Sequence, residues 1–145
     1  DLTEQSAETE LQKIVAWENE HLGYYKDTTT EETARIAREL YGHTATVIPD
    51  ITQSQIESFV SQGKPVILPT AGQMLGNPYF SGEGPPYHMI VIVGYDTEDF
   101  LAHDVGTKRG KNYHYSKEVV MNALHDWIGS KDTITQGPRV GLVIE

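Results

Sequence analysis

A histidine and an aspartate lie at the two ends of an apolar, hairpin-like stretch in the middle of the chain. Residues 87–104 read YHMIVIVGYDTEDFLAHD, so that His88 opens a β-branched run and Asp104 ends the shorter return run. In a hairpin centred near Thr97, His88 faces a residue close to 104–106, which places Asp104 opposite it or one diagonal step away. An imidazole that a carboxylate orients is the base half of a catalytic triad. The pair requires both side chains on one face of the sheet, and therefore an even cross-strand register.

The competing interpretation of His88 is a strand-end histidine that only hydrogen-bonds a backbone carbonyl. His103 is adjacent to Asp104 and should point to the opposite face, so we interpret it as structural. The chain contains no cysteine, which removes disulfides, thiolate metal sites and a cysteine nucleophile from these 145 residues. No serine lies in a GxSxG motif. The other histidines have no HExxH or similar spacing, so we expect neither a metal site nor a cofactor: His21, His43, His114 and His125.

A long segment rich in glycine, proline and tyrosine precedes the hairpin. Residues 70–86 are too many for a plain connection in a small domain, and loops of this size usually serve as lids or binding walls. Its glycines do not follow a strand and open a helix, so they are not a phosphate cradle. We expect residues 72–87 to wall a cleft beside His88, with four of them contacting substrate: Gly72, Asn77, Tyr79 and Tyr87.

Three cations follow the hairpin within four positions. Lys108, Arg109 and Lys111 lie in a loop predicted over 105–110 and just after it. Such a patch is usually solvated, but it could instead pair with an acidic substrate or with a carboxylate of this acidic chain.

Composition indicates one soluble globular domain over residues 1–145. Eleven Lys and Arg against 21 Asp and Glu give a net charge of −10, which argues against nucleic acid or an anionic membrane surface as a partner. No apolar run approaches the roughly 20 residues of a membrane span, so we expect no membrane insertion.

Periodicity and capping signals predict helices first and strands later, which is typical of an α+β fold in which N-terminal helices pack on a mostly antiparallel sheet. The expected helices are Ser6–His21, one capped by Thr29 and ended by Gly42, one capped by Thr52 or Ser54 and ended by Gly63, and Lys117–Ile128. Besides the hairpin, the expected strands are Thr44–Ile48, Pro65–Leu68, Asn112–Tyr115 and Val140–Ile144.

Three strings of the chain together resemble a known family. GKPVILPTAG, YHMIVIVGYD and HDVGTKRGKNYHYS are similar to segments of the papain-fold bacteriocin-processing peptidases, family thirty-nine of the cysteine peptidases, in its bacterial peptidase-like branch. The resemblance covers roughly residues 29–127 and implies a papain-like fold. By motif it implies that His88 is the catalytic base and Asp104 the acid that orients it. His103 and Val105 stand where the family commonly has Asn and Pro, departures that flank the acid without removing it.

The family's nucleophile is a cysteine at the start of an upstream helix, preceded by a glutamine that supplies an oxyanion donor. Neither residue can be mapped onto this chain, whose first 20 residues resemble the segment after that helix. Either the cysteine-bearing segment precedes Asp1 and was removed, or this member never had it. The start at Asp1 rather than Met favours an N-terminal truncation. We expect these 145 residues alone to be inactive as a peptidase.

The resemblance therefore implies a cysteine peptidase domain that hydrolyses peptide bonds in a peptide or protein substrate through a Cys-His-Asp triad whose cysteine is outside this chain. The first alternative is a degenerate, non-catalytic peptide-binding module that uses the same cleft. A third interpretation is an interaction domain beside a larger enzyme. The resemblance is also compatible with an exported or cell-surface bacterial protein.

Overall fold

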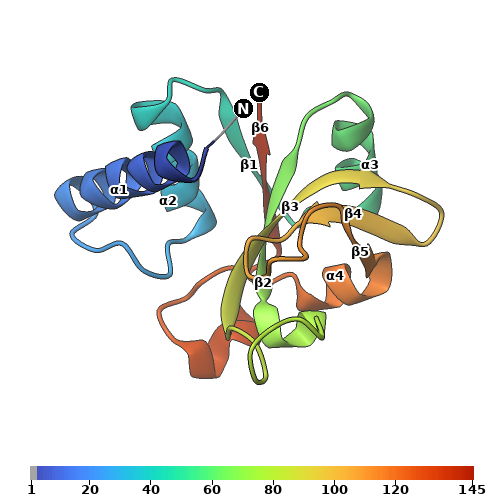
Figure 1. Cartoon of the computed structure of the whole chain (residues 1–145). Coiled ribbons are helices and arrows are strands. Elements are labelled where there is room, and N and C mark those ends of the chain that lie inside the picture. Colours follow the sequence, from blue (N-terminus) through green and yellow to red (C-terminus); the bar gives the residue numbers. More distant parts are fainter. Residues whose placement is uncertain (1–2) are drawn as a thin grey trace.

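In the computed structural model, which describes residues 3–145, six strands form one antiparallel sheet in the order β1-β6-β2-β3-β4-β5. The strands are β1 Ala45–Pro49, β2 Val66–Ala71, β3 Tyr87–Tyr95, β4 Asp99–His103, β5 Tyr113–Ser116 and β6 Val140–Ile144. Four helices accompany them: α1 Glu4–His21, α2 Thr30–Arg35, α3 Gln53–Ser61 and α4 Lys117–Ala123. Figure 1 shows α1 and α2 on one side of the sheet and α3 and α4 on the other. The predicted α+β class and antiparallel sheet are confirmed.

The main core lies between the sheet and the layer of α3 and α4. Alternate residues of each central strand point into it, as the two-residue period of a strand requires. Leu68 of β2 and Ile90 of β3 are cross-strand partners, and both are fully buried. Phe100 of β4 and Tyr115 of β5 form a second such pair on the same face. His88 lies two positions before Ile90 on β3, so its side chain points to this same face of the sheet.

The second helix begins at its predicted cap, whereas α1 begins at Glu4, two residues before the expected Ser6. Thr29 accepts a hydrogen bond from the backbone of Glu32, whose carboxylate in turn accepts one from the backbone N–H of Thr29, so the two form a capping box. After α2 the chain continues as a π-helical turn, η1 Ile36–Leu40. Gly42 then adopts a left-handed conformation with φ +71°, which ends the helical segment as predicted.

Two predicted elements are wrong in extent. The strand expected to end at Leu68 continues to Ala71, and a 3₁₀ turn, η2 Gly72–Leu75, follows at once. The helix expected to reach Ile128 ends at Ala123, because Leu124 turns extended and bridges to Thr70 of β2. The backbone N–H of His125 then donates to the carbonyl of Pro69 at 3.1 Å. Pairing with the sheet thus replaces the last turn of the predicted helix.

Two smaller differences concern the ends of the sheet. Pro49, expected to stop the first strand, is its last residue and pairs with Val140. β1 is an edge strand, where a residue without an N–H is tolerated. The polar segment expected over 129–137 contains a 3₁₀ turn, η3 Lys131–Gln136. Within residues 3–145, no helix is both long and apolar enough to cross a membrane.

Candidate active site

The hairpin of β3 and β4 brings the predicted pair into direct contact. Val91 is the partner of His103, so a continuation of this register puts His88 two positions from Asp104 on the opposite strand, which is an even offset. His88 Nε2 and Asp104 Oδ1 lie 2.7 Å apart. The predicted contact is confirmed, whereas its catalytic role stays a prediction.

Asp104 is held by more than the histidine. Its side chain is fully buried, and its second carboxylate oxygen accepts a hydrogen bond from the hydroxyl of Tyr115 at 2.5 Å. The backbone N–H of Gly106 donates to Oδ1 at 2.8 Å, and the amide of Asn77 lies 3.4 Å from Oδ2. Burial alone would raise the pKa of Asp104, but the hydrogen bonds from His88, Tyr115 and Gly106 hold that pKa below its usual value. Asp104 is therefore an ionised, fixed acceptor for the imidazole near neutral pH.

The other ring nitrogen of His88, Nδ1, lies outside this hydrogen-bond network. Among residues 3–145, Nδ1 makes no hydrogen bond, and it is not an enclosed atom. Because Nε2 contacts a carboxylate, the neutral imidazole carries its proton there and keeps the Nδ1 lone pair available. The ring of Phe80 packs edge-on against the imidazole at a centroid distance of 5.5 Å, which limits its rotation. The site thus contains an oriented base with one free nitrogen.

Two glycines allow the surrounding loops to approach His88. A Cβ at Gly72 would lie 2.5 Å from the carbonyl oxygen of Pro85 and 2.8 Å from the Cβ of His88. A Cβ at Gly106 would lie 3.0 Å from Cε1 of the imidazole. Gly72, predicted to contact substrate, therefore lies directly against the histidine, where a side chain would not fit.

The other three predicted substrate contacts differ in exposure. Tyr79 is exposed, with an accessible fraction of 45%. Asn77 is buried, and its amide donates to the hydroxyl of Tyr115 at 2.6 Å, so the structure places it beneath Asp104 rather than on the cleft surface. Tyr87 donates its hydroxyl to the carbonyl of Thr28 at 2.9 Å, so its ring alone is left to contact a ligand.

The ring of Tyr87 lines a small hollow of about 240 Å³, which the side chain of His88 does not line. Trp127 packs against it at a ring-centroid distance of 5.4 Å, and Pro85 and Pro86 form the adjoining wall. The hydroxyl of Tyr87 also lies 3.1 Å from the buried carboxylate of Asp126, and burial together with this charge raises the pKa of Tyr87. The hollow is therefore a rigid aromatic surface at the start of β3.

The sequence analysis missed Tyr115 as a partner of Asp104. A signal was present in the sequence. Tyr113 and Tyr115 are two positions apart in the strand that follows the acid, so both point to the same face of the sheet. Pairing this strand with the hairpin places Tyr115 opposite Phe100, on the same face as the core. It also missed Asp126, which accepts hydrogen bonds from the backbone of Thr30 at 3.0 and 3.2 Å and thereby joins α2 to the segment after α4.

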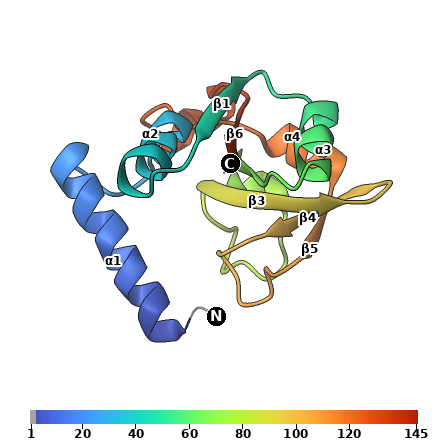
Figure 2. The same cartoon turned by 90° about the horizontal axis from the view of Figure 1, so that it is seen from above.

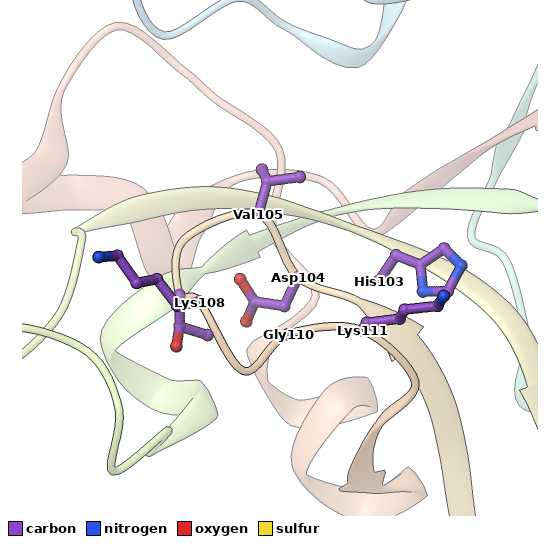
Figure 3. Close-up of a pocket in the computed structure, with 7 residues that line it drawn as sticks. His103, Asp104, Val105, Lys108, Gly110 and Lys111 are labelled. Atoms are coloured by element: carbon purple, nitrogen blue, oxygen red, sulfur yellow. The ribbon is translucent and has the colours of Figure 1, made fainter. Parts of the chain in front are cut away.

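The loop after Asp104 forms the rim of the site. It borders a hollow of about 360 Å³, lined by Asp104, Val105, Lys108 and Lys111 among others. Figure 3 shows the two lysine side chains leaving the loop in opposite directions, while the carboxylate of Asp104 points into the ring that the loop makes. Val105 stands where the resemblance leads one to expect Pro and is 88% exposed.

A carboxylate cluster at the other end of the hairpin is separate from this site. Asp96, Asp99 and His114 bring one ligand atom each within 4.8 Å of one another. Asp96 already accepts hydrogen bonds from the backbone N–H groups of Glu98 and Asp99, and these lower its pKa. The cluster is accounted for by the turn that it closes, and we assign no metal to it.

Comparison with known families agrees with this geometry. The model of the Peptidase_C39 like family matches residues 2–134. The chain belongs to this family. The match is wider than the 29–127 expected from the motifs and confirms the resemblance.

Among solved structures, the crystal structure of a candidate C39-like peptidase from Bacillus anthracis superposes on this C39-like chain with a TM-score of 0.56 at 15% sequence identity. The superposition covers 84% of this chain and 64% of that one, so this chain spans under two thirds of that protein's length. At this identity the likeness shows a shared fold. No curated protein matches the sequence.

Proposed function

We propose that this C39-like domain is the base-bearing part of a cysteine peptidase that hydrolyses peptide bonds. The observation that carries the proposal is the contact between His88 Nε2 and Asp104 Oδ1 at 2.7 Å, with Nδ1 left free. A carboxylate-oriented imidazole with one free nitrogen is what thiol activation requires. Membership of the C39-like family supports the peptidase class and a peptide as substrate.

In the proposed reaction, Nδ1 of His88 takes the proton of a cysteine thiol, and the thiolate adds to the scissile carbonyl carbon. The resulting imidazolium then gives the proton to the leaving amine as the carbon–nitrogen bond breaks. Water, deprotonated by the same nitrogen, releases the acyl group and restores the thiol. Asp104 stays ionised throughout, because its hydrogen bonds keep its pKa low, and it stabilises the imidazolium.

The thiol must come from outside these 145 residues, since they contain no cysteine. An uncovered apolar surface supports the docking of a further segment. Ile67, Met89 and Val91 lie on the face of the sheet opposite the main core and are only half-buried. Beside Ile67, an apolar hollow of about 370 Å³ opens between η1 and the sheet. A helix packed there would cover the exposed apolar side chains.

The second candidate function is a non-catalytic peptide-binding module. The absence of cysteine favours it, because the same cleft without a nucleophile can bind a peptide and cannot cleave it through a thiolate. Both candidates place the ligand against His88.

The deciding experiment uses the gene product that includes the sequence upstream of residue 1. If that product has a cysteine at the expected helix start, we expect it to hydrolyse a peptide library. His88→Ala should then lower kcat/KM by about 10²–10⁴-fold. His103→Ala is the matched control, because His103 lies one residue from Asp104 on the other face of the sheet.

Full activity in the His88→Ala variant would refute the proposed mechanism. Peptide binding without turnover, by a gene product that has no upstream cysteine, would establish the second candidate instead.

A further inference from the structure

A cluster of cations without partners borders the site in a strongly acidic chain. The net charge is −10, yet Lys108, Arg109 and Lys111 fall within four positions of one loop. Within residues 3–145, none of the three makes a salt bridge, whereas Lys13, Arg35, Arg38, Lys64 and Lys117 all do. Of the three interpretations given for this patch, pairing with a carboxylate of the described chain is therefore excluded, which leaves a solvated loop or an acidic ligand. The charge is available to a ligand.

Arg109 is the member whose position is fixed. Its guanidinium carbon lies over the ring of Tyr79, 4.7 Å from the ring centroid, in a cation–π contact. None of its side-chain N–H groups donates to another residue of the described chain. A guanidinium over an aromatic ring can still donate to a carboxylate in a bidentate arrangement.

The same contacts connect Arg109 to the catalytic pair. The backbone N–H of Tyr79 donates to the side-chain oxygen of Asn77 at 2.9 Å, and the amide of Asn77 contacts both Asp104 and Tyr115. From the other direction, the backbone N–H of Asp104 donates to the carbonyl of Gly110 at 2.9 Å, directly after Arg109. These hydrogen bonds fix the backbone of Tyr79 and of Gly110 relative to Asp104, and the ring of Tyr79 contacts the guanidinium.

The two flanking lysines would contribute to ligand binding in a different way from Arg109. Lys108 and Lys111 diverge from the loop, so they cannot bind one anion together (Figure 3). Both are exposed, and their charges act through solvent over about 8–10 Å at ordinary ionic strength. They raise the local concentration of anionic segments, while Arg109 provides the specific contact.

We propose that Arg109, seated on Tyr79, binds a carboxylate side chain of the peptide, so that the domain selects acidic segments. The proposal rests on the proposed function, because it names the substrate class of the same cleft. It predicts a preference for Asp or Glu over the isosteric Asn or Gln within a few residues of the peptide bond that faces His88. A single exposed, oriented ion pair of this kind should change affinity by about fivefold.

The test measures binding to the 145-residue chain by two-dimensional NMR. The probe is an acetylated and amidated hexapeptide of Gly and Ala with two Glu, and its counterpart has Gln in place of each Glu. We expect the Glu peptide to bind about fivefold more tightly, with shifts at Tyr79, His88 and Arg109, and the difference to shrink in 1 M salt. Arg109→Gln should remove most of the difference between the two peptides and leave only the smaller, salt-sensitive part that Lys108 and Lys111 contribute.

Arg139→Gln is the matched control, because Arg139 is also exposed and makes no salt bridge among residues 3–145, yet it precedes β6, across the sheet from β4. It should leave the preference intact. Equal affinity for the two peptides in the unmodified chain would overturn the acidic preference and leave peptide binding standing. Absence of binding by either peptide at millimolar concentration would overturn the proposed function and the preference with it.

Discussion

His88 and Asp104 show how a hairpin converts two ordinary side chains into an oriented base. The imidazole has one nitrogen on a buried carboxylate and the other free, and the carboxylate is in turn fixed by Tyr115 and Gly106. A carboxylate with a single hydrogen-bond partner could rotate and lose its contact with the imidazole. With three donors in hydrogen-bonding range, Asp104 has one orientation, and the imidazole has one tautomer.

Tyr115→Phe tests this support without touching the imidazole. The substitution removes the donor to Asp104 Oδ2 and the nearer of the two acceptors of the Asn77 amide, so we expect the free energy of unfolding to fall by about 1.5 kcal/mol at pH 7. Urea denaturation measures the change. Tyr113→Phe is the matched control, since Tyr113 lies on the same face of the same strand and its hydroxyl makes no hydrogen bond within residues 3–145.

The loss of stability in Tyr115→Phe should become smaller as the pH falls. The folded state lowers the pKa of Asp104 below its ordinary value of 3.8, so its ionised form contributes stability above pH 3.8 that is lost as pH falls through the folded pKa. Removing the Tyr115 hydroxyl raises that folded pKa towards 3.8. The difference between the two proteins should therefore shrink at pH 3. A difference that stays constant from pH 7 to pH 3 would mean that the hydroxyl does not act through the carboxylate.

The hairpin of β3 and β4 and the loop after it form the element that positions the pair. Local signals predicted the hairpin well, because the β-branched run, the Asp-rich turn and the two-residue period all lie within one continuous stretch. Cap residues Thr29 and Thr52 likewise marked the helix starts. The end of α4 was not predictable in this way, because its last residues leave the helix to pair with β2, more than 50 positions earlier in the chain.

The same limit applies to the site. His88 and Asp104 were predictable because one hairpin fixes their register. Asn77 was assigned to the cleft surface from its place in a long loop, and only the packing of that loop against β5 shows that it is buried under Asp104. The contribution of a loop residue depends on contacts that span the sheet, which no local pattern contains.

Of the glycines in the loop that follows β4, Gly110 has the least room for a side chain. A Cβ at this position would lie 1.6 Å from the carbonyl oxygen of Asp104, so Gly110→Ala must displace the loop backbone. We expect a loss of about 3 kcal/mol in the free energy of unfolding and altered NMR shifts at His88. In Gly94→Ala, the control on β3, the nearest atom is the Cβ of Leu101 at 3.3 Å, and a smaller loss is expected. Equal losses in the two variants would show that the loop adapts freely.

The two faces of the sheet are covered by helices to different extents. The layer of α3 and α4 is closely packed against β2 and β3, whose central residues Leu68 and Ile90 are fully buried. On the other side, α1 lies at the periphery beyond α2 (Figure 2), and the residues of its first half, Glu4–Ile14, are exposed or half-exposed. The face that the proposed nucleophile segment would cover is thus also the face with the weaker packing.

This difference predicts two levels of local stability, because segments with little buried surface open at lower free energy than the core. In hydrogen exchange, the amides of α1 should exchange orders of magnitude faster than those of β2 and β3. Trp17 connects α1 to α2, since the guanidinium of Arg35 lies 5.6 Å from the centroid of its buried ring, which also stacks on His21 of the same helix at 4.4 Å.

Trp17→Ala should therefore remove the remaining protection from α1 and leave that of β2 and β3 nearly unchanged. Leu11→Ala is the control on the same helix, because Leu11 is 58% exposed and its loss should change little. If Trp17→Ala instead lowered the protection of the sheet by the same factor as that of α1, the molecule would unfold as a single unit, and α1 would be part of the core. Independent opening of α1 would mean that the half-covered face of the sheet can become accessible to a further segment while the base and its carboxylate stay in place.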